Sequence, residues 1–502
     1  MKFRLADIAD VLGCAPPHPP DAPVNGYSID SRTVRPGELF FAVQGKKLDG
    51  HDYVASALDA GAVAAVVAGE RRGDFPESAR SKLLAVPDTL RALQQLAATA
   101  RRRWGGPLVA VTGSMGKTTT KQMAAALLRT HCRVLENEGN LNNHFGLPLS
   151  LLRLEPDTEA GVFELAMSGP GEIRLLADLA APDVAVVTNV GPVHLEFFAD
   201  VDAIARAKFE LIEALGERAW AVLNADDARV TRFGERVPGR ALSFGFSAHA
   251  DVRGEDLVCD ARGGWAFTLA SQALPAAAFG AARRAPGAER WQVGEPTRFH
   301  LPMVGRHNVL NALAALSVAY LFGIPPGALK DAVAELRPGS MRGEVVRLTN
   351  GATAVIDCYN SNPTALNAML EAVQSLPGQR RIAVLGAMLE LGGDAAALHA
   401  QCGARVAELG FDLLITVGAE ADAVAEGARR YGLPAGKCIR MNTPEEAGKW
   451  LRRELREGDV VLFKASRAAH LERAWDQLGE HRLGEPELAT ARKDRSASVP
   501  SN

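Results

Sequence analysis

Short apolar runs alternate with longer amphipathic segments along most of this chain. Each apolar run is bounded by turn residues, which predicts a strand buried inside a sheet. Apolar residues recur at helical spacing over 89–103, 118–129 and 201–215. Strands are expected over 37–43, 61–67, 107–111, 161–165, 184–188, 353–357, 381–385, 413–417 and 460–463. This alternation is typical of an α/β protein with mostly parallel sheets covered by helices on both faces.

The chain divides into three expected domains and a tail. Its 502 residues exceed what one core supports, and about 150 residues per domain suggests about three. Turn residues at 104–107 and 338–339 mark the two boundaries. We expect a small α/β domain over 1–105, a central parallel-sheet domain over 106–337 and a smaller Rossmann-like domain over 338–485. Residues 272–297, rich in Ala, Arg, Gly and Pro, are expected to form a flexible insertion, and the polar tail 486–502 to be disordered.

Composition narrows the range of partners. The 56 Lys and Arg residues nearly balance 59 Asp and Glu residues, so no global field favours nucleic acid or an anionic membrane. No apolar run is long enough to span a bilayer, and the charged N-terminus does not match a signal peptide. Six scattered cysteines without a Cys-x-x-Cys pair indicate reduced thiols in a cytoplasmic protein.

The clearest chemical motif is a phosphate loop over residues 113–119. It follows a short apolar strand and begins a helix, whose free N–H groups favour phosphate oxygens. Lys117 is suited to neutralise phosphate charge, and the Thr118 hydroxyl is suited to bind Mg²⁺. Only two residues separate Gly113 from Gly116, whereas the common pattern has four. The segment predicts nucleotide binding but not a reaction.

Three further residues are candidates for metal binding or catalysis, and each also has an ordinary structural interpretation. Glu164 ends a predicted strand, so it is either a Mg²⁺ ligand or a solvated carboxylate. His194 follows another strand and is either a metal ligand or an ordinary loop residue. Lys208 lies on an amphipathic helix and, taken alone, is a lysine facing solvent.

Two groups of asparagines offer amide donors and acceptors. Asn142 and Asn143 lie in a glycine-bounded polar loop, which is either a substrate site or an Asn-rich turn. Asn308 and Asn311 share one face at the start of a predicted helix, because they are three residues apart. They either contact an adenine edge or cap the helix.

The last candidates lie at and after the second domain boundary. Arg342 either reaches a γ-phosphate when the domains close or is a surface arginine. Asp357 follows an apolar strand and is suited to accept hydrogen bonds from ribose hydroxyls. Tyr359, Asn360 and Asn362 are suited to line a peptide-sized pocket, and the alternative is an Asn-Pro turn.

Taken together, these segments resemble the Mur ligase family, the ATP-dependent amide-bond ligases of peptidoglycan precursor synthesis. The resemblance covers nearly the whole chain and explains the short phosphate loop, which is the family's own form. Its carriers are Asp30–Arg32, Gly45–Asp52, Thr112–Thr120, Gly139–Asn143, Thr188–Gly191, His194–Glu196, Gly305–Asn308 and Asp357–Pro363.

The resemblance implies a role for each candidate. Lys117, Lys208 and His194 would be catalytic. Thr118 and Glu164 would bind one Mg²⁺, and His194 with Lys208, carbamylated by CO₂, would bind a second. ATP would contact Gly113, Ser114, Gly116, Lys117, Thr118, Thr119, Asn308, Asn311, Arg342 and Asp357. The UDP-substrate would contact Ser28, Asp30, Ser31, Arg32, Asn142 and Asn143, and a dipeptide would contact Tyr359, Asn360 and Asn362.

The implied substrates are ATP, UDP-MurNAc-tripeptide and D-Ala-D-Ala, acted on by a monomer. The Tyr-Asn-x-Asn-Pro segment over 359–363 indicates the branch of the family that adds a dipeptide. Two positions depart from the family pattern, since Phe209 stands where Gly is usual and Ala387 where Asp is usual. The alternatives are the ligase that adds the third residue, a folylpolyglutamate-type ligase, or a regulator that binds ATP without ligating.

Overall fold

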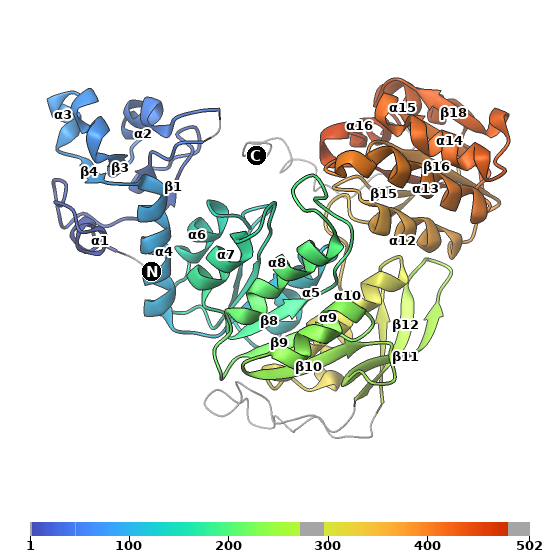
Figure 1. The fold of residues 1–502 in the computed structure, drawn as a ribbon, viewed down its shortest axis with the longest axis horizontal. Coiled ribbons are helices and arrows are strands. Elements are labelled where there is room, and N and C mark those ends of the chain that lie inside the picture. Colours follow the sequence, from blue (N-terminus) through green and yellow to red (C-terminus); the bar gives the residue numbers. More distant parts are fainter. Residues whose placement is uncertain (1–2, 46, 272–295, 480–502) are drawn as a thin grey trace.

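The computed structural model describes residues 3–45, 47–271 and 296–479, which form three sheets with helices around each (Figure 1). The expected fold class, α/β with a small first sheet, a central sheet and a Rossmann-like last sheet, is confirmed. Of the expected insertion over 272–297, only the last two residues are described, and Thr297 begins a strand. The expected disordered tail over 486–502 lies outside the described residues.

The N-terminal unit is built on four parallel strands in the order β1-β2-β3-β4. The expected strands over 37–43 and 61–67 are confirmed in shorter form as β2 and β3. The strands are β1 (Gly26–Ser28), β2 (Glu38–Phe41), β3 (Ala64–Ala68) and β4 (Leu83–Val86), and the helices are α1 (Leu5–Leu12), η1 (Gly50–Tyr53), α2 (Val54–Asp59), η2 (Gly69–Asp74), α3 (Glu77–Arg80) and α4 (Thr89–Trp104).

Helix α4 joins the first unit to the second. Its N-terminus is capped by Asp88, whose side chain accepts from the Arg91 N–H, and it ends at Gly105 in the left-handed conformation. It packs against α6 (Gly146–Leu151) and α7 (Glu172–Ala180) of the central unit. The first two units are therefore joined by a packed helix in addition to the linker at 104–107.

The central unit has nine strands in the order β13-β12-β11-β10-β9-β8-β5-β7-β6. Only β12 runs against its neighbours, so the expected parallel character holds for the other pairings. The strands are β5 (Leu108–Thr112), β6 (Val134–Glu136), β7 (Ala160–Glu164), β8 (Val184–Val187), β9 (Trp220–Asn224), β10 (Arg240–Gly245), β11 (Val252–Cys259), β12 (Trp265–Ser271) and β13 (Thr297–Leu301). The remaining helices are α5 (Lys117–Arg129), α8 (Val201–Glu213), α9 (Ala228–Phe233), η3 (Gly234–Arg236), α10 (Arg306–Leu321), η4 (Pro326–Leu329) and α11 (Lys330–Ala334).

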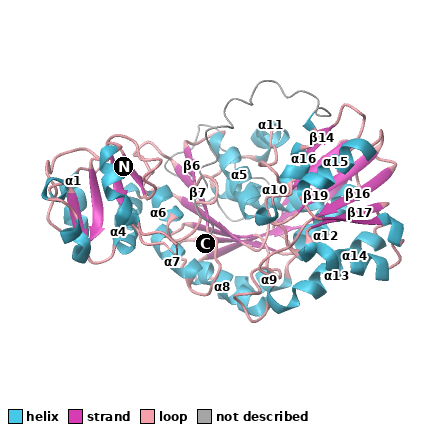
Figure 2. Ribbon diagram, turned by 90° about the horizontal axis from the view of Figure 1, so that it is seen from above, coloured by secondary structure: helices cyan, strands magenta, loops and turns pink. Residues whose placement is uncertain are grey.

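Alternate residues of β5 face two different cores. Val109 and Val111 pack with α5 and α10 on one face, while Leu108 and Ala110 pack with α7 and α8 on the other (Figure 2). Because both faces are covered, the strand is apolar throughout. This burial leaves only its carboxyl end free to meet a ligand.

The C-terminal unit has six strands in the order β14-β15-β19-β16-β17-β18, and only β14 is antiparallel to its neighbour. Helices α12, α13 and α14 cover one face, and α15 and α16 the other (Figure 2). The strands are β14 (Glu344–Arg347), β15 (Thr353–Asp357), β16 (Arg380–Leu385), β17 (Leu413–Val417), β18 (Cys438–Met441) and β19 (Asp459–Lys464). The helices are α12 (Pro363–Gln374), η5 (Gly392–Asp394), α13 (Ala395–Glu408), η6 (Ala419–Ala421), α14 (Asp422–Arg430), η7 (Ala435–Lys437), α15 (Pro444–Glu454), η8 (Arg467–Ala469) and α16 (Glu472–Asp476).

Within the described ranges, no helix combines the length and apolar character that crossing a membrane requires.

Candidate active site

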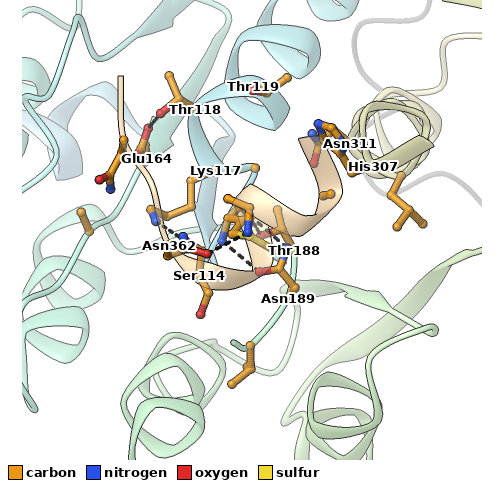
Figure 3. Close-up of a pocket in the computed structure, with 18 of the residues that line it drawn as sticks. Ser114, Lys117, Thr118, Thr119, Glu164, Thr188, Asn189, His307, Asn311 and Asn362 are labelled. Atoms are coloured by element: carbon orange, nitrogen blue, oxygen red, sulfur yellow. Dashed lines mark hydrogen bonds between the residues drawn. The ribbon is translucent and has the colours of Figure 1, made fainter. Parts of the chain in front are cut away.

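A cavity of about 750 Å³ lies where strand ends of the central sheet face the C-terminal unit. Figure 3 shows several of the residues that line it. The cavity collects most of the predicted site residues: Ser114, Gly116, Lys117, Thr118, Thr119, Asn142, Asn143, Glu164, His194, Asn308, Asn311, Arg342, Asp357, Tyr359, Asn360 and Asn362. Gly113, Lys208, Ser28, Asp30, Ser31 and Arg32 are not among its lining residues.

The phosphate loop turns sharply between β5 and α5. Gly116 has φ of +76°, and a Cβ there would lie 2.3 Å from the Asn311 amide oxygen. At Gly113 a Cβ would lie 1.9 Å from the Thr188 hydroxyl. Only glycine fits these two positions, so the loop backbone packs directly against neighbouring side chains.

The Thr118 hydroxyl joins a carboxylate and a guanidinium. It donates to Glu164 at 2.7 Å and accepts from Arg342 at 3.1 Å. Glu164 is 3% exposed, so the solvated alternative is wrong for this residue. Arg342 also stacks over the Tyr359 ring at 3.9 Å, so it is held in the cavity and is not a surface arginine.

Amide groups fix the orientation of Glu164. The Asn142 side chain donates to its second carboxylate oxygen at 2.9 Å, and the Glu164 N–H donates to Asn137 at 2.9 Å. Asn143 instead accepts from the N–H groups of Phe145 and Gly146, at the start of α6. The polar loop over 139–146 therefore shapes the site and also satisfies its own backbone.

The two lysines predicted to be catalytic differ in their partners. The Lys117 ammonium donates to the Gly113 carbonyl at 2.8 Å, and burial lowers its pKa while Glu164 opposes that shift. Lys208 is 2% exposed, so the solvent-facing alternative is wrong. Burial, and then the charge of Lys117, lowers the pKa of Lys208 well below its usual value. Among the described residues, Lys208 has neither a hydrogen bond nor an ion pair.

His194 meets the C-terminal unit. Its Nδ1 lies 2.5 Å from a Glu390 carboxylate oxygen, and this hydrogen bond lowers the pKa of Glu390. The Glu196 N–H donates to the Glu390 carbonyl at 3.3 Å. His194 also lines the cavity, so this residue contacts both the cavity and the C-terminal unit.

The asparagines of α10 lie within the helix and not at its cap. Asn308 donates to the Val304 carbonyl at 2.8 Å, and Asn311 donates to Asn308 at 3.1 Å. Gly305 is the N-cap and makes no side-chain cap. The capping alternative is therefore wrong, and both amides line the cavity.

Lys464 donates two hydrogen bonds to the segment at the end of β15 and just after it. This buried lysine donates to Asp357 at 2.5 Å and to the Asn360 carbonyl at 3.1 Å. Asn362 caps α12 by accepting from the Ala365 N–H at 2.9 Å, as the turn alternative expects, and it also lines the cavity. Tyr359 and Asn360 line the same wall.

The predicted UDP-substrate residues of the first unit form a separate turn. The Arg32 guanidinium donates two hydrogen bonds to the Asp30 carboxylate, at 2.9 and 2.7 Å. These hydrogen bonds are the main cause of the lowered pKa of Asp30. The Ser28 hydroxyl donates to the Asp30 carbonyl at 3.0 Å. The turn, which includes Ser31, lies in the N-terminal unit, away from the cavity.

The two departures from the family pattern are accommodated by packing. Phe209 is buried against Phe233 with ring centroids 5.0 Å apart. Ala387 is 4% exposed, and its carbonyl accepts from the Ser466 N–H at 2.9 Å. Neither side chain lines the cavity.

Sequence reasoning missed several residues that line the cavity. They are Asn189, Asn224, Asp226, Asp227 and His307, together with Lys464, which the sequence places at the carboxyl end of an expected strand without assigning it a role. The sequence contained a signal for Asn224, Asp226 and Asp227. They lie at and just after the end of the apolar run of β9, as other site segments follow β7 and β8. His307 adjoins the predicted Asn308, and burial lowers its pKa to about 4.

Three family models match the chain in order. The model described as Mur ligase family, catalytic domain, matches residues 23–101. Those described as Mur ligase middle domain and Mur ligase, glutamate ligase domain, match residues 111–319 and 341–467.

Individual proteins give a similar result. The chain is 33% identical to the UDP-N-acetylmuramoyl-tripeptide–D-alanyl-D-alanine ligase of Bacillus subtilis, over 96% of this chain and 100% of that protein. A crystal structure of MurF from Acinetobacter baumannii matches with a TM-score of 0.82 at 27% identity, covering 96% of this chain and 99% of that one. MurF ligase from Thermotoga maritima, in complex with ADP, matches with a TM-score of 0.77 at 31% identity, covering 91% and 97%.

Proposed function

The chain belongs to the Mur ligase family, and from this premise we propose that it joins D-alanyl-D-alanine to UDP-MurNAc-tripeptide with consumption of ATP. The product would be UDP-MurNAc-pentapeptide, a peptidoglycan precursor. The full-length similarity to named ligases of this specificity supports the substrate pair.

One observation supports the proposal most strongly. The Thr118 hydroxyl contacts Glu164 of the central sheet and Arg342 of the segment leading to the C-terminal sheet. A phosphate loop, a carboxylate and a guanidinium thus meet at one point, which suits transfer of a phosphoryl group. A regulator that only binds a nucleotide needs neither this meeting of groups nor the second side of the cavity, which Tyr359, Asn360 and Asn362 line.

The first metal site would be formed by Thr118 and Glu164. A hydroxyl and a carboxylate oxygen are the hard ligands that Mg²⁺ prefers, and the two groups already touch at 2.7 Å. Their donor set fits the ion. Bound there, Mg²⁺ would neutralise charge on the phosphates of ATP.

The second metal site would use His194 and Lys208. An ammonium does not bind a cation, but the buried, unpaired Lys208 has a lowered pKa that favours the neutral amine. The amine nitrogen attacks the carbon of CO₂ and loses a proton, which leaves a carbamate with two oxygen ligands. His194 offers Nε2, since Nδ1 is bound to Glu390.

The residues then suit two chemical steps. In the first, the terminal carboxylate of the tripeptide attacks the γ-phosphorus and ADP leaves, giving an acyl phosphate. Lys117, Arg342 and the N–H groups of α5 would stabilise the negative charge that develops on the transferred group. In the second, the amine of D-Ala-D-Ala attacks the acyl carbon and phosphate leaves from a tetrahedral intermediate.

Each domain would hold one substrate. The domain over 1–105 would bind the UDP moiety through Ser28, Asp30, Ser31 and Arg32, with Asn142 and Asn143 reaching the peptide. The domain over 106–337 would bind ATP through the phosphate loop, Asn308 and Asn311, with Arg342 and Asp357 joining from the third domain. That domain, over 338–485, would bind the dipeptide through Tyr359, Asn360 and Asn362. Closure of the domains would exclude the water that hydrolyses an acyl phosphate.

We propose a monomer that acts in the cytoplasm. The six cysteines are free thiols, which suits a reducing compartment. The candidate residues for ATP and the dipeptide line one cavity of a single chain, which suits a monomer.

The decisive experiment is ADP release from purified protein. We expect release that requires both UDP-MurNAc-tripeptide and D-Ala-D-Ala. Release with a single free amino acid in place of the dipeptide would favour the third-residue ligase, and release with glutamate and a folate would favour the folylpolyglutamate type. ATP binding without amine-dependent release would favour the regulator.

A further inference from the structure

The backbone N–H groups of Ser114 and Met115, between the two glycines of the phosphate loop, are bound by a neighbouring segment. Between Gly113 and Gly116 stand only Ser114 and Met115, which leaves little chain for internal hydrogen bonds. The supporting segment, Thr188–Gly191, follows β8 and lies beside the loop (Figure 3). The contacts between these two segments carry the inference.

Asn189 binds both backbone polar groups of Met115. Its side-chain oxygen accepts from the Met115 N–H at 2.9 Å, and its amide nitrogen donates to the Met115 carbonyl at 3.2 Å. The Asn189 carbonyl accepts from the Ser114 N–H at 3.0 Å. The Thr188 hydroxyl donates to the same Met115 carbonyl at 2.5 Å. Four hydrogen bonds thus fix a two-residue stretch.

The supporting segment is itself fixed before any ligand arrives. The Asn224 side chain donates to the Thr188 carbonyl at 2.7 Å, and the Val190 N–H donates to Asp227 at 2.7 Å. The Gly191 N–H donates to the Ser114 hydroxyl at 2.8 Å. Because β8 and β9 are neighbours in the sheet, these contacts connect the loop to the rigid core.

This arrangement decides which N–H groups meet an anion. The Ser114 and Met115 N–H groups are bound to Asn189, whereas the first N–H groups of α5 have no partner within the helix. No side chain caps α5. Phosphate oxygens are therefore directed to the helix N-terminus and to Lys117, at a position that the Met115 contacts set.

We propose that Asn189 is a positioning residue for phosphoryl transfer. Its side-chain amide makes the hydrogen bonds to the loop backbone that the two residues absent from this short loop would otherwise make. The inference rests on the proposed use of ATP, and the role proposed for Asn189 is exerted through its contacts with Met115. Holding Met115 sets the direction of α5's free N–H groups and of the Lys117 side chain. Loss of the amide lets the loop move and misplaces the phosphates.

The test compares Asn189→Ala with Asn350→Ala. Asn350 also accepts from one backbone N–H and donates to one carbonyl, at 3.1 Å each, but it does not line the cavity. We expect Asn189→Ala to weaken binding of a non-hydrolysable ATP analogue about tenfold and to lower kcat by about 10- to 100-fold. The KM for the UDP-substrate and the melting temperature should match those of Asn350→Ala.

Thr188→Val serves if Asn189→Ala does not fold. It removes one hydrogen bond to Met115 at similar volume, so a weaker loss of ATP-analogue affinity is expected, with Thr188→Ser close to wild type. Unchanged ATP-analogue affinity and kcat in the Asn189 variant would overturn the inference, as would an equal loss of UDP-substrate binding. Nucleotide affinity is measured without ligation, so a wild-type protein that binds ATP but does not ligate the dipeptide refutes the proposed function separately.

Discussion

His194 and Glu390 pair across the contact between the central and C-terminal units, with 2.5 Å between the imidazole Nδ1 and a carboxylate oxygen. Both residues adopt left-handed backbone conformations, with φ of +56° and +63°. Such conformations are unfavourable for residues other than glycine, and they persist where surrounding contacts hold them. The pairing therefore links the imidazole of the candidate second metal site to the position of the C-terminal unit.

Glu390→Gln should lower kcat about tenfold with little change in the KM for ATP, because the neutral amide holds the His194 ring less firmly. Steady-state kinetics at saturating substrates would measure the change. Glu196→Gln is the matched control, since this neighbouring carboxylate is exposed and does not line the cavity. A kcat equal to that of the control would refute the positioning role of Glu390.

Lys117→Ala should abolish most ligation while leaving the UDP-substrate bound. Its ammonium lies on the phosphate loop and is suited to stabilise the transferred phosphoryl group, so a loss in kcat of about 10²- to 10³-fold is expected. Initial rates of ADP release and calorimetric binding of UDP-MurNAc-tripeptide would separate the two effects. Lys437→Ala, at an exposed position, is the control. Equal loss of activity and of UDP-substrate binding would count against the assigned role.

Local patterns predicted the elements whose contacts are local. The strand at 107–111, the two glycines and the following helix predicted β5, the phosphate loop and α5, because each depends on neighbours in sequence. The strand expected over 353–357 is found with those bounds. The strands β9 to β13 were not predicted, and the antiparallel direction of β12 depends on how strands from 252 to 301 pair.

The site was predictable by residue type but not by contact. Arg342 reaches Thr118 across 224 positions and His194 reaches Glu390 across 196, and no spacing rule predicts such pairs. The solvent-facing interpretation of Lys208 was wrong because helical periodicity describes one helix, whereas the burial of this side chain depends on what packs around α8. Asn189 was marked only as part of the family segment 188–191, and its contact with Met115, 74 positions away, follows no spacing rule.

Lys208 should carry one CO₂ adduct, because its buried amine lacks a partner and has a lowered pKa. Removing CO₂ from the buffer should lower the ligation rate, and added bicarbonate should restore it. Labelling with ¹³C-bicarbonate should give one bound carbamate resonance, absent from Lys208→Arg. Lys121→Arg is the control, since Lys121 is equally buried but donates to Asn137 at 2.5 Å. An active, metal-bound enzyme without that resonance would refute the adduct.

His307 should destabilise the fold as the pH falls from about 6.5 toward about 4. Burial lowers its folded pKa from 6.5 to about 4, with Asp357 opposing the shift and Lys464 adding to it. Between these values the unfolded chain binds the proton and the folded chain does not, so protonation favours unfolding. Urea unfolding at pH 7 and pH 5 should show a smaller loss for His307→Gln than for wild type. His300→Gln, at a half-exposed histidine, should behave as wild type, and an unchanged pH response in His307→Gln would contradict the prediction.

Arg101→Met should destabilise the junction between the first two units by about 2–4 kcal/mol, because it removes charge-assisted hydrogen bonds at a buried site. Arg101 is 6% exposed. Its guanidinium donates to the Ala180 carbonyl at 2.7 Å and to Asp183 at 2.9 Å. Asp183 also accepts from the Leu108 N–H at 2.9 Å, so the same carboxylate holds α4 and the start of β5. The methionine keeps much of the stem's volume, so the loss reports the hydrogen bonds more than the packing.

The first transition in urea would measure the effect, with Arg102→Met, at the exposed neighbouring arginine, as the control. Equal unfolding of the two variants would mean that α4 is held to the central unit by its apolar face alone.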